Sequence, residues 1–251
     1  MRTPRPFPVA FAALPERKQD RFPAEDRRVL TLGGSWSHPV TCPRCARDFE
    51  LLARIPAPLM EEITGDAWEL PVLLCVACQA WCMVTYQVEE SGAVVLLDYT
   101  LGDVIDIGRC PGIPETELTL VKVPHNTLRE WEHAQALMAQ LINRPDFSAD
   151  ADTADFYDLL RETETCLTKW WGDRSTDALT YLGGRAPGFE LVGEGYCPLT
   201  GEPMMCLGQI GGGFDHQYLT SDPGAHFVIH VAMGSRVVRV MTAGTDVVRQ
   251  Y

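Results

Sequence analysis

The chain has 251 residues, of which 46% are hydrophobic and 22% charged, and it carries a formal net charge of −13 at pH 7. This length fits one large domain or two small ones, and no apolar run approaches the roughly 20 residues that a membrane-spanning helix needs. The acidity argues against nucleic acid as the main ligand, because an acidic surface repels phosphates, and it favours a basic protein partner. Acidity that only keeps the protein soluble is the alternative. We expect no association with a membrane, and the sequence does not indicate an oligomeric state.

Residues 1–28 differ in charge from the rest of the chain. They hold seven Arg or Lys residues against four Asp or Glu residues, and prolines interrupt their short apolar patch. This composition predicts a basic, proline-rich arm rather than a signal peptide. Nine cysteines in a chain without a signal peptide indicate reduced thiols and metal binding in the cytoplasm, not a disulfide framework.

Short segments rich in Val, Leu, Ile and aromatic residues, bounded by Pro or Gly, predict β-strands in two parts of the chain. In the first lobe, residues 29–123, the predicted strands are 49–55, 70–76, 81–88, 93–99 and 118–123. In the second lobe, residues 176–251, they are 203–210, 226–233 and 236–241.

Residues 124–175 predict a helical connector between these lobes. The first helix begins with a capping box from Thr127 to Glu130, and the second covers residues 153–171 with several aspartates in its first turns. The predicted fold class is therefore α+β, with two β-rich lobes joined by helices.

Two CxxC pairs lie in the first lobe: Cys42 with Cys45, and Cys75 with Cys78. Together they supply four sulfurs, the number that a closed, tetrahedral structural zinc site takes. Such a site leaves no coordination position open for chemistry. The alternative is a thiol–disulfide motif, but a catalytic CxxC pair normally opens a helix, whereas these first cysteines precede a predicted strand.

The two lobes align with each other. Leu32-Gly33-Gly34 recurs as Leu182-Gly183-Gly184, and from Cys42 onward the alignment continues without a gap at an offset of 155 residues. This predicts an internal duplication. The four cysteines align with Cys197, Thr200, His230 and Met233, and because Thr and Met are poor substitutes for thiolates, we expect the second lobe to lack the metal.

Other residue groups leave further functions open. Cys197 with Asp215, His216, His226 and His230 contains the residue types of a Cys-His catalytic set, without a motif that orders them. Trp36, Trp68 and Trp81 accompany the cysteines, and packing in the core is their default role. One of them could instead be an exposed anchor for a partner.

The motifs resemble two known families. The first lobe, LGGSW…CPRC…FELLARIPAPL…LLCVAC, resembles the N-terminal half of the programmed cell death protein two family. The second lobe, LGGRAPGFE…CPLTGEPMMCLGQI…SDPGAHFVI, is similar to the bacterial YwqG-like family. The resemblance implies a duplicated β-rich fold with a structural metal. The eukaryotic relatives are chaperones for a ribosomal protein, and the bacterial ones have no settled activity.

The leading hypothesis is a non-enzymatic, zinc-stabilised protein-binding module, chaperone-like or inhibitory toward a basic partner. The metal ligands are Cys42, Cys45, Cys75 and Cys78, and no catalytic or cofactor-binding residue is assigned. One alternative is an enzyme, either a thiol oxidoreductase or a Cys-His hydrolase. A nucleic-acid-binding zinc module is another, and it would depend on the basic residues of the arm, which are Arg2, Arg5, Arg17, Lys18, Arg21, Arg27 and Arg28.

Overall fold

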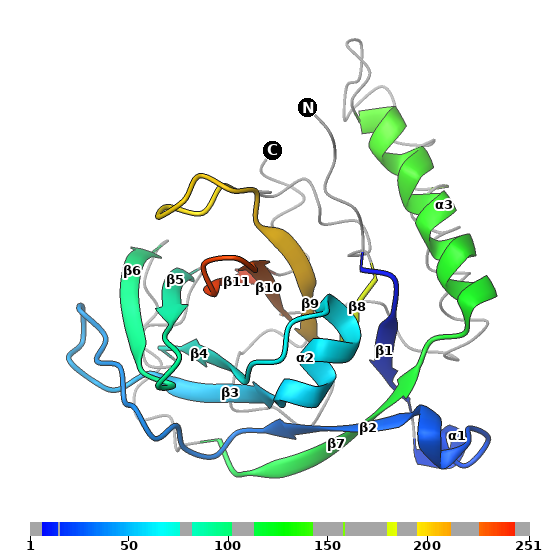
Figure 1. The fold of residues 1–251 in the computed structure, drawn as a ribbon, viewed down its shortest axis with the longest axis horizontal. Helices are drawn as coiled ribbons and strands as arrows, with labels where there is room; N and C mark the ends of the chain where they lie inside the picture. Colours follow the sequence, from blue (N-terminus) through cyan, green and yellow to red (C-terminus); the bar gives the residue numbers. More distant parts are fainter. Residues whose placement is uncertain are drawn as a thin grey trace.

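The computed structural model describes residues 7–14, 16–75, 82–101, 113–142, 158, 180–184, 195–211 and 226–243. Its described strands form one sheet in the order β4-β3-β2-β7-β1-β8-β9-β10-β11-β5-β6, and each neighbouring pair is antiparallel. The strands are β1 (Ala10–Ala13), β2 (Arg27–Leu32), β3 (Glu50–Ile55), β4 (Leu70–Leu74), β5 (Cys82–Val88), β6 (Val94–Leu101), β7 (Thr116–Lys122), β8 (Tyr181–Gly183), β9 (Met205–Gly211), β10 (His226–Ala232) and β11 (Val237–Ala243). Figure 1 shows that the sheet curls round on itself.

The helices of the described residues are α1 (Glu16–Gln19), a 3-10 turn (Ala24–Asp26), α2 (Ala57–Thr64) and α3 (His125–Ile142). α2 lies inside the curl of the sheet, where Leu59, Met60 and Ile63 are buried, and α3 projects away from it (Figure 1). α2 ends at Gly65, whose φ of 88° turns the chain out of the helix. None of these helices is both long and apolar enough to cross a membrane.

The sequence predicted the strands better than the helices. All eight predicted strands are present with ends within about two residues of those expected, which is the usual uncertainty of such boundaries. α3 is also present, but it begins at His125, and the N–H of Leu128 donates to Pro124 O at 3.0 Å. Thr127 therefore lies within the first turn, so the predicted capping box is wrong. The second predicted helix lies outside the described residues, apart from Asp158, which is helical.

The predicted N-terminal arm is not separate from the fold. Residues 10–13 form β1, which pairs with β7 on one side and β8 on the other, and all four residues are buried. The ring of Phe11, fully buried, lies 5.3 Å from the Arg28 guanidinium, and Arg28 and Lys122 both bond to Glu62. The prediction of an arm is therefore wrong for β1, which joins the two halves of the sheet.

The strands of the two predicted lobes are interleaved in space. β5 and β6, from the first half of the chain, lie beyond β11 from the second half. β4, also from the first half, is the strand at the opposite end of the sheet. The described strands thus form one continuous β-layer rather than two separate sheets.

The two ends of the sheet approach each other where β4 faces β5, a region we call the seam. The hydroxyl of Tyr86 on β5 donates to Pro71 O on β4 at 2.6 Å and accepts from the N–H of Leu73 at 3.1 Å. Tyr86 is fully buried. One side chain therefore bonds the main chain of β4, an edge strand whose polar groups would otherwise need another partner.

Tyr86→Phe should destabilise the protein by about 1–3 kcal/mol, because it removes both hydrogen bonds of the seam and leaves the N–H of Leu73 buried and unpaired. Urea unfolding followed by circular dichroism measures the change. Tyr196→Phe is the matched control, since Tyr196 is 53% exposed, and it should change stability by less than about 0.5 kcal/mol. Equal stability of the two variants would show that the seam does not depend on Tyr86.

Candidate metal centre

A tight hairpin over residues 41–48, the first hairpin, brings two of the predicted ligands together. Thr41 and Asp48 form its closing bridge, and the N–H of Cys42 donates to Arg47 O at 2.7 Å. The N–H of Ala46 returns to Cys42 O at 3.0 Å, and Ala46 takes a φ of 58°, which an alanine adopts only when its surroundings hold it there. The turn therefore places Cys45 next to Cys42.

The third predicted ligand comes from a distant part of the chain. Cys75 directly follows β4, and its sulfur lies 3.5 Å from that of Cys45. The Sγ atoms of Cys42, Cys45 and Cys75 all lie within 4.8 Å of one another. A tetrahedral ion with Zn–S bonds of about 2.3 Å would separate its sulfurs by about 3.8 Å, so the three thiols are close enough to hold a metal ion. Cys78 lies outside the described residues.

The surroundings of Cys42 favour its thiolate form. Burial raises the pKa of this thiol, but hydrogen bonds to its sulfur from the N–H of Cys45, the Tyr99 hydroxyl, the N–H of Arg44 and the Cys75 thiol outweigh burial and lower the pKa to about 7. The ring of Tyr99 packs against Phe49 with 5.7 Å between ring centroids. Metals bind the thiolate, so this environment prepares Cys42 as a ligand.

The same environment bears on the redox alternative. Cys42, Cys45 and Cys75 are in the thiol form, and the first pair lies in a hairpin that leads into β3 rather than at the start of a helix. The hydrogen bonds to sulfur come from the hairpin and from Tyr99 on β6. The first CxxC pair, which is fully described, thus lacks the helix N-terminus that activates a catalytic pair.

A second hairpin over residues 196–203 repeats the geometry of the first at an offset of 155. Tyr196 and Pro203 form its closing bridge, the N–H of Cys197 donates to Glu202 O at 2.8 Å, and the N–H of Gly201 donates to Cys197 O at 2.9 Å. Gly201 has a φ of 70°, matching the positive φ of its counterpart in the first hairpin. The strand that follows each hairpin also carries a bulge at the equivalent position, Leu52 in β3 and Leu207 in β9.

The second hairpin does not gather metal ligands in the described residues. The sequence alignment predicted His230 at the position of Cys75, but the strand register contradicts this. Leu51 pairs with Leu73 in the first half and Cys206 with His230 in the second, which places Ala232, not His230, at the position of Cys75. Ala232 packs against Cys197. The ungapped alignment is therefore two residues out of register on this strand.

Cys197 instead ends a chain of hydrogen bonds. Its sulfur lies 3.2 Å from Ser235 Oγ, and the Ser235 hydroxyl donates to Glu202 Oε1 at 3.0 Å. Either atom of the Cys197–Ser235 contact can donate. Burial raises the pKa of the Cys197 thiol, but hydrogen bonds from Ser235, Thr200 and the N–H of Leu199 outweigh burial and lower the pKa. The Cys-His catalytic alternative is not supported here: the described side chains that bond Cys197 are Ser235 and Thr200, and Asp215 and His216 lie outside the described residues.

His230 is a buried group of the sheet. It is 2% exposed, and Arg239 on β11 and Cys206 on β9 are its cross-strand neighbours. Burial, together with the positive charge of Arg239, lowers the pKa of His230 to about 4. The folded protein therefore keeps this histidine uncharged at neutral pH.

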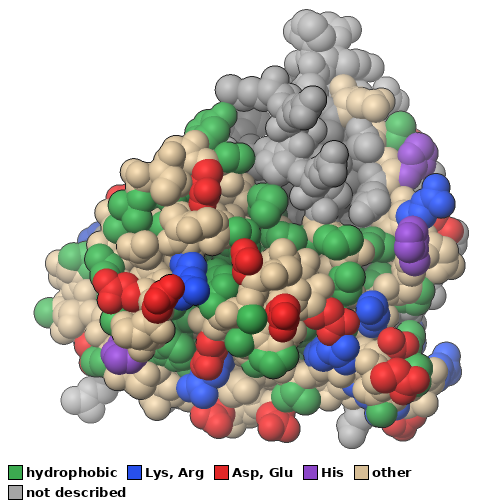
Figure 2. Space-filling model, in the orientation of Figure 1, with side chains coloured by type: hydrophobic (Ala, Val, Ile, Leu, Met, Phe, Trp, Pro, Cys, Tyr) green, Lys and Arg blue, Asp and Glu red, His purple; other side chains and the backbone are tan. Residues whose placement is uncertain are grey.

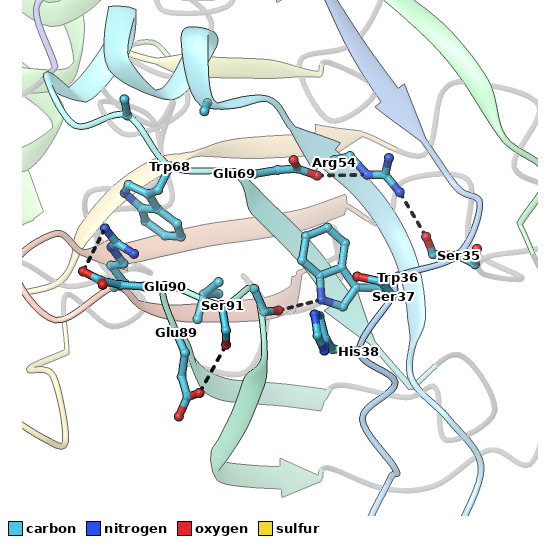
Figure 3. A pocket seen from close by; sticks show the side chains of 15 residues that line it. Ser35, Trp36, Ser37, His38, Arg54, Trp68, Glu69, Glu89, Glu90 and Ser91 are labelled. Atoms are coloured by element: carbon cyan, nitrogen blue, oxygen red, sulfur yellow. Dashed lines mark hydrogen bonds and ion pairs between the residues drawn. The ribbon is translucent and has the colours of Figure 1, made fainter.

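A pocket of about 720 Å³ lies near the other end of the seam from the cysteines, and we call it the tryptophan pocket (Figure 3). Trp36 and Trp68, two of the tryptophans considered as interaction anchors, line it, whereas Trp81 lies outside the described residues. Its charged lining consists of Arg54, Glu69, Glu89, Glu90 and Arg236. The sequence did not indicate this group, because its members come from segments far apart in the chain.

No known protein family, curated protein or solved structure matches this chain. The two family resemblances therefore stay predictions, and the metal centre and the tryptophan pocket are interpreted from their own geometry.

Replacing Cys42 or Cys75 with Ser should destabilise the protein by at least about 3 kcal/mol, because the binding free energy of a structural metal is also folding free energy. Cys197→Ser, in the equivalent hairpin, should cost at most about 1 kcal/mol, since it replaces only one end of a hydrogen-bond chain. Thermal unfolding and metal content, measured on the same samples, test this. Equal losses in all three variants would mean that Cys197 also holds a metal.

The stability of the protein should fall below pH 6.5 because of His230. Its pKa is lower in the folded state than in the unfolded state, so the unfolded chain binds the proton between about pH 6.5 and pH 4. The contribution is fully present above pH 6.5 and is lost as the pH falls toward 4. From pH 7 to pH 5 the loss amounts to roughly 2 kcal/mol.

Urea unfolding of the wild type and of His230→Gln at pH 7 and pH 5 separates the contribution of His230 to the free energy of unfolding from that of the carboxylates, which titrate in both proteins. The variant should lose roughly 2 kcal/mol less than the wild type over this interval. Parallel pH profiles would contradict the assignment.

Proposed function

We propose that the protein is a non-enzymatic protein-binding module braced by one structural zinc ion, with Cys42, Cys45, Cys75 and Cys78 as ligands. The observation that carries the proposal is the cluster of three thiols from two distant segments, close enough to share one metal ion. Four thiolates would close the coordination sphere, so the ion would brace the fold and perform no chemistry. Thiolate donors favour zinc over magnesium or calcium, which prefer oxygen.

The duplication forms part of this proposal. The matching hydrogen bonds, positive φ angles and bulges of the two hairpins support two copies of one ancestral unit. The second copy would have lost its ligands, and the chain of Cys197, Ser235 and Glu202 would take over the local role of the metal. A copy that keeps the fold without a metal supports a bracing rather than a catalytic role for the zinc.

Protein binding is supported by charge and by shape. The net charge of −13 would attract a basic partner and raise its association rate. The tryptophan pocket supplies aromatic and charged side chains at one place, as the binding centres of protein interfaces do. Free, closely spaced thiols suit a reducing compartment, so we propose the cytoplasm as the location.

Purification of the protein from its native cells tests metal and partner together. We expect one zinc ion per chain and a stoichiometric protein partner after a non-denaturing purification. Cys42→Ser should lose both the zinc and the partner, because the first half depends on the metal. Cys197→Ser is the matched control and should keep both. A wild-type protein that retains zinc, carries no partner and turns over a small molecule would exclude the proposal.

A further inference from the structure

We propose that the tryptophan pocket binds the guanidinium group of an arginine presented by the protein partner. The inference rests on the proposed function, since it names the chemistry by which the module recognises that partner. It is carried by three features of the pocket, which are its aromatic walls, its balance of charge and the restraints that hold its side chains in place.

The pocket is assembled from segments far apart in the chain. Trp36 follows β2 and Trp68 precedes β4, while Glu89 and Glu90 belong to the turn between β5 and β6. Arg236 comes from the turn between β10 and β11. The two indoles and the acidic turn border one space (Figure 3). Its volume, about 720 Å³, is in the range of ligand sites and accommodates more than one amino-acid side chain.

The structure already contains a guanidinium bound in this pocket. The Arg54 guanidinium carbon lies 5.7 Å from the centroid of the Trp36 ring, within the range of a cation–π contact. Arg54 also pairs with Glu69 at 3.2 Å and donates to the Ser35 carbonyl at 3.0 Å. An indole face, a carboxylate and a carbonyl together satisfy a guanidinium, so the lining of the pocket suits this group.

The pocket lining has one more carboxylate than it has arginines, so its net charge favours binding of a further cation. Three glutamates and two arginines line the pocket, so these five side chains sum to −1. Arg54 is paired with Glu69, and Arg236 lies 3.9 Å from Glu90. The remaining carboxylate, Glu89, is exposed and accepts a long hydrogen bond of 3.5 Å from the Ser91 hydroxyl. An incoming cation would therefore find a carboxylate that pairs with no arginine of the described pocket lining.

Figure 2 shows how charged side chains are distributed on one face of the molecule. Acidic side chains there are distributed over the described part of the molecule and interspersed with Lys and Arg rather than gathered in one patch. The overall negative charge attracts a basic partner without selecting a residue of it. Selection of one side chain requires the combination of indoles and an unneutralised carboxylate, which the pocket supplies.

Arginine fits this lining better than lysine. Its planar guanidinium can stack on an indole and donate to a carboxylate at the same time, whereas an ammonium is a compact, strongly hydrated charge. The two indole side chains are held in place before a ligand binds: Trp68 is 6% exposed, and Trp36 Nε1 donates to Gly92 O at 3.2 Å. Gly92 has a φ of 82°, and a Cβ there would lie 3.8 Å from the Trp36 ring. The acidic turn and the indole are therefore fixed against each other.

Titrations of the full-length, zinc-loaded protein with short Gly/Ser peptides test the proposal. The peptides differ only in the central residue, which is arginine, lysine or citrulline, the neutral isostere of arginine. The six indole N–H signals are followed by NMR after assignment with single Trp→Phe variants. We expect the arginine peptide to shift the signals of Trp36 and Trp68 and to bind at least about fivefold more tightly than citrulline, with an affinity that falls as salt is added.

Glu89→Gln should weaken binding of the arginine peptide about fivefold, and Trp36→Ala at least as much. Glu89→Gln is isosteric and exposed, so its result does not depend on whether Trp36→Ala folds. The matched control is Glu117→Gln, which removes an exposed glutamate on β7 outside the pocket and should change nothing. Equal binding of arginine and citrulline, or shifts confined to other tryptophans, would overturn the proposal.

The native-cell experiment separates this inference from the proposed function. If the partner is retained by Glu89→Gln and Trp36→Ala as firmly as by the wild type, the protein is a binding module but the pocket is not its arginine site. If the arginine peptide binds as described while no partner is found, the pocket chemistry stands and the proposed function fails.

Discussion

The fold depends on a side-chain link between the two ends of a curled sheet, which do not pair with each other as strands. β4 at one end and the β5–β6 pair at the other are linked by the Tyr86 hydroxyl, which bonds two main-chain groups of β4. An edge strand with unpaired main-chain groups invites the addition of a foreign strand. The Tyr86 hydroxyl bonds two of the main-chain groups on that edge from within the same chain. It therefore holds the ends of the curled sheet close together although they form no strand pair.

The metal centre and the tryptophan pocket occupy opposite ends of this seam. Cys75 follows the end of β4, whereas Trp68 precedes its start. Tyr99, which donates to Cys42, reaches the cysteines from β6, so the cluster links the first hairpin to both ends of the sheet. The chain between β2 and the first hairpin carries Trp36, and a brace on the cysteines therefore also restrains one wall of the pocket. A metal bound at one end of the seam would thus support the arginine recognition that we propose at the other end.

What the sequence could predict was local. Strands with Val, Leu and Ile between Pro or Gly were recognisable, and the spacing of the cysteines indicated a shared metal. β1, β2 and β8 were not predicted: β1 and β8 are short, β2 begins with two arginines, and all three owe their strand form to neighbours on both sides. The roles of Tyr86 and Tyr99 depend on partners in remote segments. The ungapped alignment was out of register at His230 because the paired residues Cys206 and His230 are two residues further apart in the chain than their counterparts Leu51 and Leu73, and a few identities do not reveal so small a gap.

The sheet order explains why one hairpin would need a metal and the other would not. β10, which carries Ala232, has β9 on one side and β11 on the other, so hydrogen bonds hold it along both edges. β4, which leads to Cys75, is paired only with β3 and is the last strand of the sheet. A strand held on one side can leave its neighbour more easily, and a metal bond at its end would offset the missing ladder. The cysteines therefore lie at the end of an edge strand, and the position of the metal that we propose would follow from topology more than from chemistry.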